Sequence, residues 1–113
     1  MPPPVDYAEF RSNQDPSAVA ARIAENVGAC WFAGGRAAFA AYSYTPELTS
    51  YSNRPRVLVV GKANPTGLPK LVIEATQADR GSSVRLFGPL MATAEASAIS
   101  RDVGRWASGS TGC

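Results

Sequence analysis

Apolar residues recur at helical spacing near both ends of the chain. Asp15 is a suitable N-cap, and Pro16 loses nothing by lacking an N–H group in the first turn of a helix. The segment that follows is rich in alanine and carries one apolar stripe, made of Val19, Ile23, Val27 and Cys30. This pattern predicts a helix that begins at Pro16 and ends at the glycine pair 34–35.

A second apolar stripe lies close to the C-terminus. Its residues are Ala96, Ile99, Val103 and Trp106. Thr93 stands where a cap belongs, and Gly109 stands where a helix would end. The spacing therefore predicts a second helix.

Four segments between the helices have the composition of β-strands, at residues 37–45, 56–62, 71–77 and 83–88. In the third, Leu71, Ile73 and Ala75 alternate with more polar residues and so share one face. The connecting segments are short and rich in turn-forming residues. They favour antiparallel neighbours, because a parallel crossover needs about a dozen residues or more.

The predicted element order is α-β-β-β-β-α, which indicates an α+β fold. Each helix has one apolar stripe and the sheet offers one apolar face. We therefore expect a two-layer sandwich, with a four-stranded antiparallel meander and both helices on one face. Residues 1–14 are Pro-rich and polar and are expected to form a flexible arm, and residues 15–113 a single domain.

The composition of the chain narrows the range of possible functions. The 113 residues include 11 basic and 9 acidic ones, a net charge of +2, without a block of like charge. Neither a nucleic-acid partner nor a basic membrane patch is indicated, and no apolar run is long enough to span a bilayer. Histidine is absent, which removes the most common general base and metal ligand. We expect no enzyme activity, no cofactor and no metal site.

The role of Cys30 is the sharpest chemical question. A lipid-anchor interpretation of the segment VGAC conflicts with the polar Arg22 and Glu25 just before it. A disulfide with Cys113, a buried free thiol and an active thiol remain open. The even cysteine count favours the disulfide, which would stabilise the fold and indicate an oxidising compartment.

Two groups of aromatic residues are candidate sites. A ligand pocket between sheet and helices would be lined by Trp31, Phe39, Phe87 and Trp106. A partner surface on the open face of the sheet would carry Tyr42, Tyr44, Tyr51 and Arg54. Prolines 46, 55 and 69 would limit pairing at the sheet edges.

These observations predict a non-catalytic binding or accessory module of the bacterial cell envelope or periplasm, which acts through protein–protein contacts. The partner would be another protein or, in a homodimer, a second copy. The alternatives are a carrier of a small apolar ligand and a thiol protein centred on Cys30. The Pro-rich opening suits the start of a mature exported domain and equally suits a native start. We expect a periplasmic or secreted protein, with a cytoplasmic one as the alternative.

Overall fold

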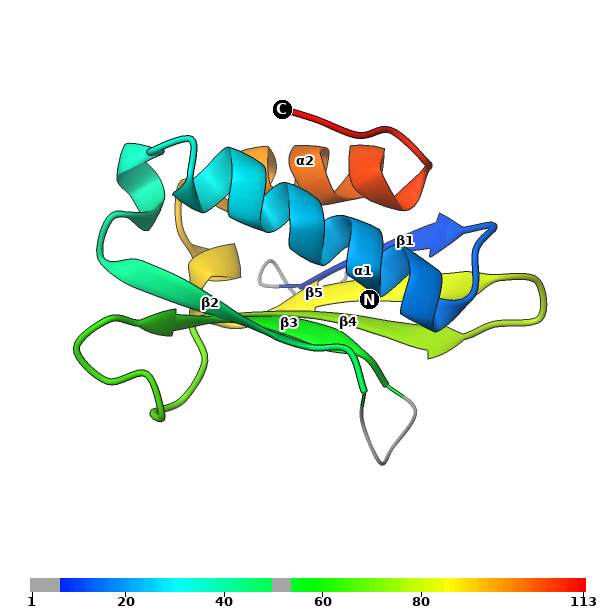
Figure 1. The fold of residues 1–113 in the computed structure, drawn as a ribbon, viewed down its shortest axis with the longest axis horizontal. Helices are drawn as coiled ribbons and strands as arrows, with labels where there is room; N and C mark the ends of the chain where they lie inside the picture. Colours follow the sequence, from blue (N-terminus) through cyan, green and yellow to red (C-terminus); the bar gives the residue numbers. More distant parts are fainter. Residues whose placement is uncertain (1–6, 50–53) are drawn as a thin grey trace.

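Two helices lie across one face of a five-stranded antiparallel sheet in the computed structural model, which describes residues 7–49 and 54–113 (Figure 1). The strand order is β1-β5-β4-β3-β2, so β1 and β2 form the two edges. The strands are β1 (Tyr7–Ser12), β2 (Tyr42–Glu47), β3 (Arg56–Gly61), β4 (Leu71–Gln77) and β5 (Ser82–Phe87). The helical elements are α1 (Pro16–Asn26), the π-helix η1 (Val27–Phe32), the 3₁₀ turns η2 (Ala37–Phe39) and η3 (Pro89–Ala92), and α2 (Ala96–Ala107).

The α+β class is confirmed, but the expected number of strands is wrong. Residues 7–12 form the edge strand β1 instead of continuing a flexible arm, and β1 pairs with β5 from Tyr7 opposite Phe87 to Ser12 opposite Ser82. This pairing joins segments that lie far apart in the sequence, so no local pattern indicates it. The sheet therefore has five strands, with α1 lying between β1 and β2 in the sequence.

The first of the four predicted strands begins later than its composition predicts. Residues 37–39 form the turn η2, and β2 begins at Tyr42. The alanines of segment 37–45 favour helical over extended backbone, which explains the difference. Pro46 lies inside β2, where it is tolerated because β2 is an edge strand.

The first helix begins as predicted. The carboxylate of Asp15 accepts a hydrogen bond from the Ala18 N–H at 2.7 Å, and Pro16 occupies the first turn. The predicted stripe from Val19 to Cys30 is buried. The helix changes from α to π geometry at Val27, and the Ala33 N–H donates to the Gly28 carbonyl, five residues back, at 2.8 Å.

The second helix covers the β1 side of the sheet. It begins at Ala96, slightly after the predicted cap, and its apolar stripe from Ile99 to Trp106 is buried. A Cβ atom at Gly104 would lie 3.0 Å from the Phe10 ring, so the glycine allows α2 to approach β1 closely. Neither α1 nor α2, within the described residues, has the length and apolar content of a membrane-spanning helix.

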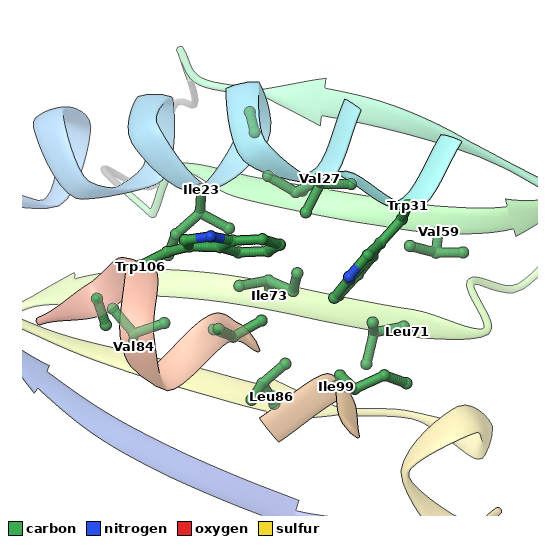
Figure 2. Close-up of a cluster of buried hydrophobic side chains, with 14 of the residues drawn as sticks. Ile23, Val27, Trp31, Val59, Leu71, Ile73, Val84, Leu86, Ile99 and Trp106 are labelled. Atoms are coloured by element: carbon green, nitrogen blue, oxygen red, sulfur yellow. The ribbon is translucent and has the colours of Figure 1, made fainter. Parts of the chain in front are cut away.

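The core fills the space between the helices and the sheet (Figure 2). Trp31 from η1 and Trp106 from α2 both point into this space and are fully buried, with ring centroids 5.5 Å apart. The side chains of the sheet that meet them come from alternate positions, as predicted for β4. They are Val57, Val59, Leu71, Ile73, Ala75, Val84 and Leu86.

The outer face of the sheet carries a row of alternating charges. The strand register places them side by side in the order Glu9, Arg85, Glu74, Arg56 and Glu47. The Arg56 Nε–H donates to the Glu47 carboxylate at 2.7 Å. Opposite charges on neighbouring strands stabilise the pairing, so in this row of three glutamates and two arginines each arginine is flanked by acidic residues.

Candidate functional site

A groove of about 500 Å³ opens where the helical layer meets the edge strand β2. Its walls come from η1, from the segment around η2, from β2 and from the start of the β3–β4 loop. We call it the aromatic groove, and its lining residues are Trp31, Phe32, Gly35, Arg36, Phe39, Ala40, Tyr42, Ser43, Tyr44 and Lys62.

Two larger hollows, of about 650 and 590 Å³, lie elsewhere. The first is lined by Thr49 and the second by Tyr7, and each of these residues adjoins a segment outside the described residues. The lining of the aromatic groove stays clear of both segments, and it combines aromatic rings with charged groups. We therefore take the aromatic groove as the candidate site.

Four rings form a continuous series of contacts along the aromatic groove. Trp31 and Phe39 are nearly parallel with centroids 4.5 Å apart, and Phe39 meets Phe32 at 5.5 Å. Phe32 in turn stacks on Tyr44 at 4.9 Å. Trp31 and Phe39 are buried, whereas Phe32 and Tyr44 are half-buried and so offer ring surface to a ligand.

Gly28 allows Tyr44 to reach this series of rings. A Cβ atom at position 28 would lie 2.9 Å from Tyr44 Cζ and would also meet the hydroxyl. The tyrosine ring therefore occupies the space that a larger residue on η1 would fill.

The charged groups at the aromatic groove are both cationic. The Arg36 guanidinium lies 5.7 Å from the centroid of Phe39 and donates to the Asp102 carboxylate of α2 at 2.7 Å. Lys62 is exposed, and no ion pair joins it to another residue in the described ranges. The aromatic groove therefore has a positive rim, at which the Lys62 ammonium group has no ion-pair partner among the described residues.

Asp102 holds one wall of the aromatic groove in place. Its carboxylate also accepts hydrogen bonds from Trp31 Nε1 at 2.9 Å and from Arg105 at 3.2 Å. Burial raises the pKa of Asp102, but hydrogen bonds from Trp31, Arg105 and Arg36 and the Arg36 charge outweigh it, so the pKa is lowered. The ionised carboxylate joins α2 to η1 and to Arg36.

The edge of β2 leaves main-chain groups free beside the aromatic groove. The Lys62 N–H donates to the Ala41 carbonyl at 3.0 Å, so the odd-numbered residues of β2 bond to β3. The N–H and C=O groups of Tyr42 and Tyr44 consequently point away from the sheet. Within the described residues, no hydrogen bond engages these four groups.

The predicted ligand pocket is only partly assembled. Trp31 and Phe39 line the aromatic groove, whereas Trp106 is fully buried in the core and lines no part of it. Phe87 is paired with Tyr7 and Val72 on the outer face, because it alternates with the core residue Leu86. The structure thus brings Trp31 and Phe39 together at the aromatic groove and places Phe87 and Trp106 away from it.

The predicted partner surface also changes place. Tyr42 and Tyr44 share a face, as expected, but that face packs against the core beneath the helices. Arg54 is exposed just before β3, and Tyr51 lies outside the described residues. Sequence reasoning missed Phe32, Arg36 and Lys62, and the only available signal was the closeness of the first two to Trp31 in the chain.

On the opposite side of η1, the C-terminal tail is fastened to the helices, and it runs across their outer surface in Figure 1. Cys30 and Cys113 form a disulfide, so the predicted bridge is present and Cys30 has no free thiol. The Gly112 N–H donates to Asn26 Oδ1 at 2.7 Å, and Trp106 Nε1 donates to the Gly112 carbonyl at 2.9 Å. We call these contacts the tail clasp.

Comparison with known proteins adds no relative, because no family model, no curated protein and no solved structure matches the chain. Among the residues that the structure describes, no cluster of three or more metal-ligating side chains occurs. The aromatic groove and the β2 edge are therefore interpreted from their own chemistry.

Proposed function

We propose that this protein is a non-catalytic binding module that acts through protein–protein contacts in the bacterial periplasm or cell envelope. One observation carries the proposal: an aromatic groove lies beside an edge strand whose outward main-chain groups, those of Tyr42 and Tyr44, have no hydrogen-bond partner within the described residues. Aromatic side chains contribute large contact areas, and free strand edges recruit extended segments of other chains.

The chemistry of the chain supports a binding role over a catalytic one. The chain contains no histidine, and both cysteines are used in the disulfide. The titratable groups that line the aromatic groove, apart from tyrosines, are Arg36 and Lys62, which suit recognition of negative charge.

The alternating charges on the outer face make that face a weaker candidate. Arg56 and Glu47 already form an ion pair there, and Arg85 lies between two glutamates in the strand register. A partner would have to replace interactions that the sheet makes with itself.

The compartment is inferred from the disulfide. Such bridges persist in the periplasm and outside the cell and are rare in a reducing cytosol. The Cys30–Cys113 bridge therefore favours an exported protein over a cytosolic one.

A small apolar ligand is the second candidate, and the size of the aromatic groove favours it. A volume of about 500 Å³ lies within the range of roughly 300 to 1,000 Å³ that small-molecule sites occupy. The same experiment separates this candidate from a protein partner.

The test is site-specific photo-crosslinking in cells of the native host. Ala40, an exposed alanine that lines the aromatic groove, is replaced by a photoreactive amino acid, and exposed Ala21 on α1 is the matched control. We expect a discrete protein adduct from position 40 and none from position 21. An adduct of small mass would favour the ligand carrier over a protein partner, and no adduct at all would overturn both.

A further inference from the structure

We propose that the β2 edge binds an extended, acidic peptide segment of a partner protein as an added strand, with one large apolar side chain in the aromatic groove. The inference rests on the proposed function and specifies the chemistry of the partner. It follows from the main-chain groups, the side chains and the charges at the site.

The main chain sets the place and length of the added strand. The outward groups of Tyr42 and Tyr44 supply two donors and two acceptors, spaced as the next strand of a sheet requires. Pro46 has no N–H group, so pairing ends there. The partner contributes a short strand that faces residues 42–45.

Side-chain alternation then places the anchor. In an added strand, the residues opposite Tyr42 and Tyr44 point to the helix-facing side, where the aromatic groove lies. Phe32 and Tyr44 are half-buried there, and their ring faces are available for a further apolar or aromatic side chain.

The positive charge at the rim of the aromatic groove favours an acidic partner segment. Lys62 is exposed at the rim without an ion-pair partner in the described part of the chain, whereas Arg36 is already paired with Asp102. A carboxylate two residues from the anchor, on the groove-facing side of the added strand, would complement Lys62.

A second copy of this chain fits the site less well. The residues of β2 that face the groove side are Tyr42, Tyr44 and Pro46, none of them acidic. Edge-to-edge pairing of two β2 strands would therefore leave Lys62 without a counter-charge from the partner strand.

The first experiment selects peptides from a random octapeptide library displayed on phage, with the oxidised full chain as bait. We expect enrichment of sequences that carry one large apolar residue near an aspartate or glutamate and that lack lysine and arginine. Lys62→Glu is expected to weaken a selected synthetic peptide about tenfold or more. Lys70→Glu makes the same charge change on an exposed residue outside the aromatic groove and should leave affinity within about twofold.

The second experiment tests for strand addition by methylating each main-chain nitrogen of the selected peptide in turn. Methylation at alternate positions should weaken binding about tenfold or more, because only alternate N–H groups face β2. The peptide should also slow hydrogen exchange at the amides of Tyr42 and Tyr44.

Several results would overturn the inference: no enrichment, enriched peptides that bind Lys62→Glu as well as the wild type, or a methylation scan without alternation. A crosslink from position 40 to a second copy of the chain would also overturn it. If position 40 forms adducts with another protein while the peptide tests fail, the proposed function stands and the strand-addition inference falls. An adduct of small mass at position 40 would overturn both the proposed protein-binding function and the strand-addition inference.

Discussion

The two sides of the π-helix η1 are held by different kinds of interaction. On the side of the tail clasp, Cys30 is joined covalently to Cys113, and hydrogen bonds fix Gly112 between two helices. On the side of the aromatic groove, Phe32 meets Tyr44 only by ring stacking. One helical turn thus separates a covalently cross-linked surface from one where two rings meet by stacking.

The difference assigns separate tasks to neighbouring residues. Covalent and polar contacts with defined geometry hold the helical layer together, and aromatic contacts tolerate a new neighbour at small cost. Asp102 lies between the two sides, because its carboxylate binds Trp31 in the core and Arg36 at the rim of the groove. We therefore expect a substitution to lower the free energy of unfolding by a smaller amount the closer it lies to the aromatic groove.

Removal of the disulfide should have the largest effect. We expect the double substitution Cys30→Ala and Cys113→Ala to lower the free energy of unfolding by roughly 4 to 5 kcal/mol. The reason is that the bridge closes a long loop, because its two cysteines are 83 residues apart in the sequence. Urea unfolding followed by tryptophan fluorescence measures it, and reduced wild-type protein should behave like the double variant. A loss below about 1 kcal/mol would show that the tail clasp does not hold the fold.

Loss of the Asp102 carboxylate should rank second. Asp102→Ala leaves the fully buried Trp31 without an acceptor for its N–H, and we expect a loss of about 2 to 3 kcal/mol. Asp102→Asn keeps a neutral acceptor and should cost about 1 kcal/mol. Equal losses in the two variants would contradict the assignment of this hydrogen bond.

The ionisation of Asp102 also predicts a pH dependence. Its pKa is lower in the folded protein than its ordinary value, so the unfolded chain binds more protons between the two values. The stabilisation is fully present above the ordinary carboxyl range near pH 4 and is lost as pH falls through the folded value. In unfolding measured from pH 7 to pH 2, the stability difference between wild type and Asp102→Asn should shrink as pH falls below the ordinary carboxyl range, and a constant difference would contradict this.

Local signals in the sequence predicted what local interactions determine. The N-cap at Asp15 and the alternation of Leu71 and Ile73 gave the first helix and β4 because both depend on near neighbours. The strand β1 was not predicted, because its partner, β5, is far away in the sequence.

The candidate site was harder to predict than the fold. The spacing of Tyr42 and Tyr44 shows that they share a face, but which face depends on where the helices pack. Lys62 and Phe32 line the same groove only because β2 pairs with β3, and no short-range pattern in the sequence indicates that pairing. The disulfide was predictable because two cysteines allow one intramolecular pair.

On the groove side, Gly28→Ala tests the contact between η1 and Tyr44. The new methyl group displaces the tyrosine ring, so we expect a loss of about 1 to 2 kcal/mol. In a Tyr44→Ala background the same change should be neutral or stabilising by up to about 1 kcal/mol, since alanine is the better helix former. This reversal of sign, measured by urea unfolding, identifies the ring as the cause, and equal losses in both backgrounds would exclude it.

Charge reversal at the rim should have the smallest effect on stability. Lys62 is exposed and has no ion-pair partner in the described residues, so Lys62→Glu should change the free energy of unfolding by less than about 0.5 kcal/mol. Lys70→Glu is the matched control, and thermal unfolding compares the two variants. A loss of about 1 kcal/mol or more in Lys62→Glu alone would mean that the ammonium group supports the fold. An unchanged stability, together with weakened peptide binding, would instead assign Lys62 to recognition, on the side of η1 that the fold leaves loosely held.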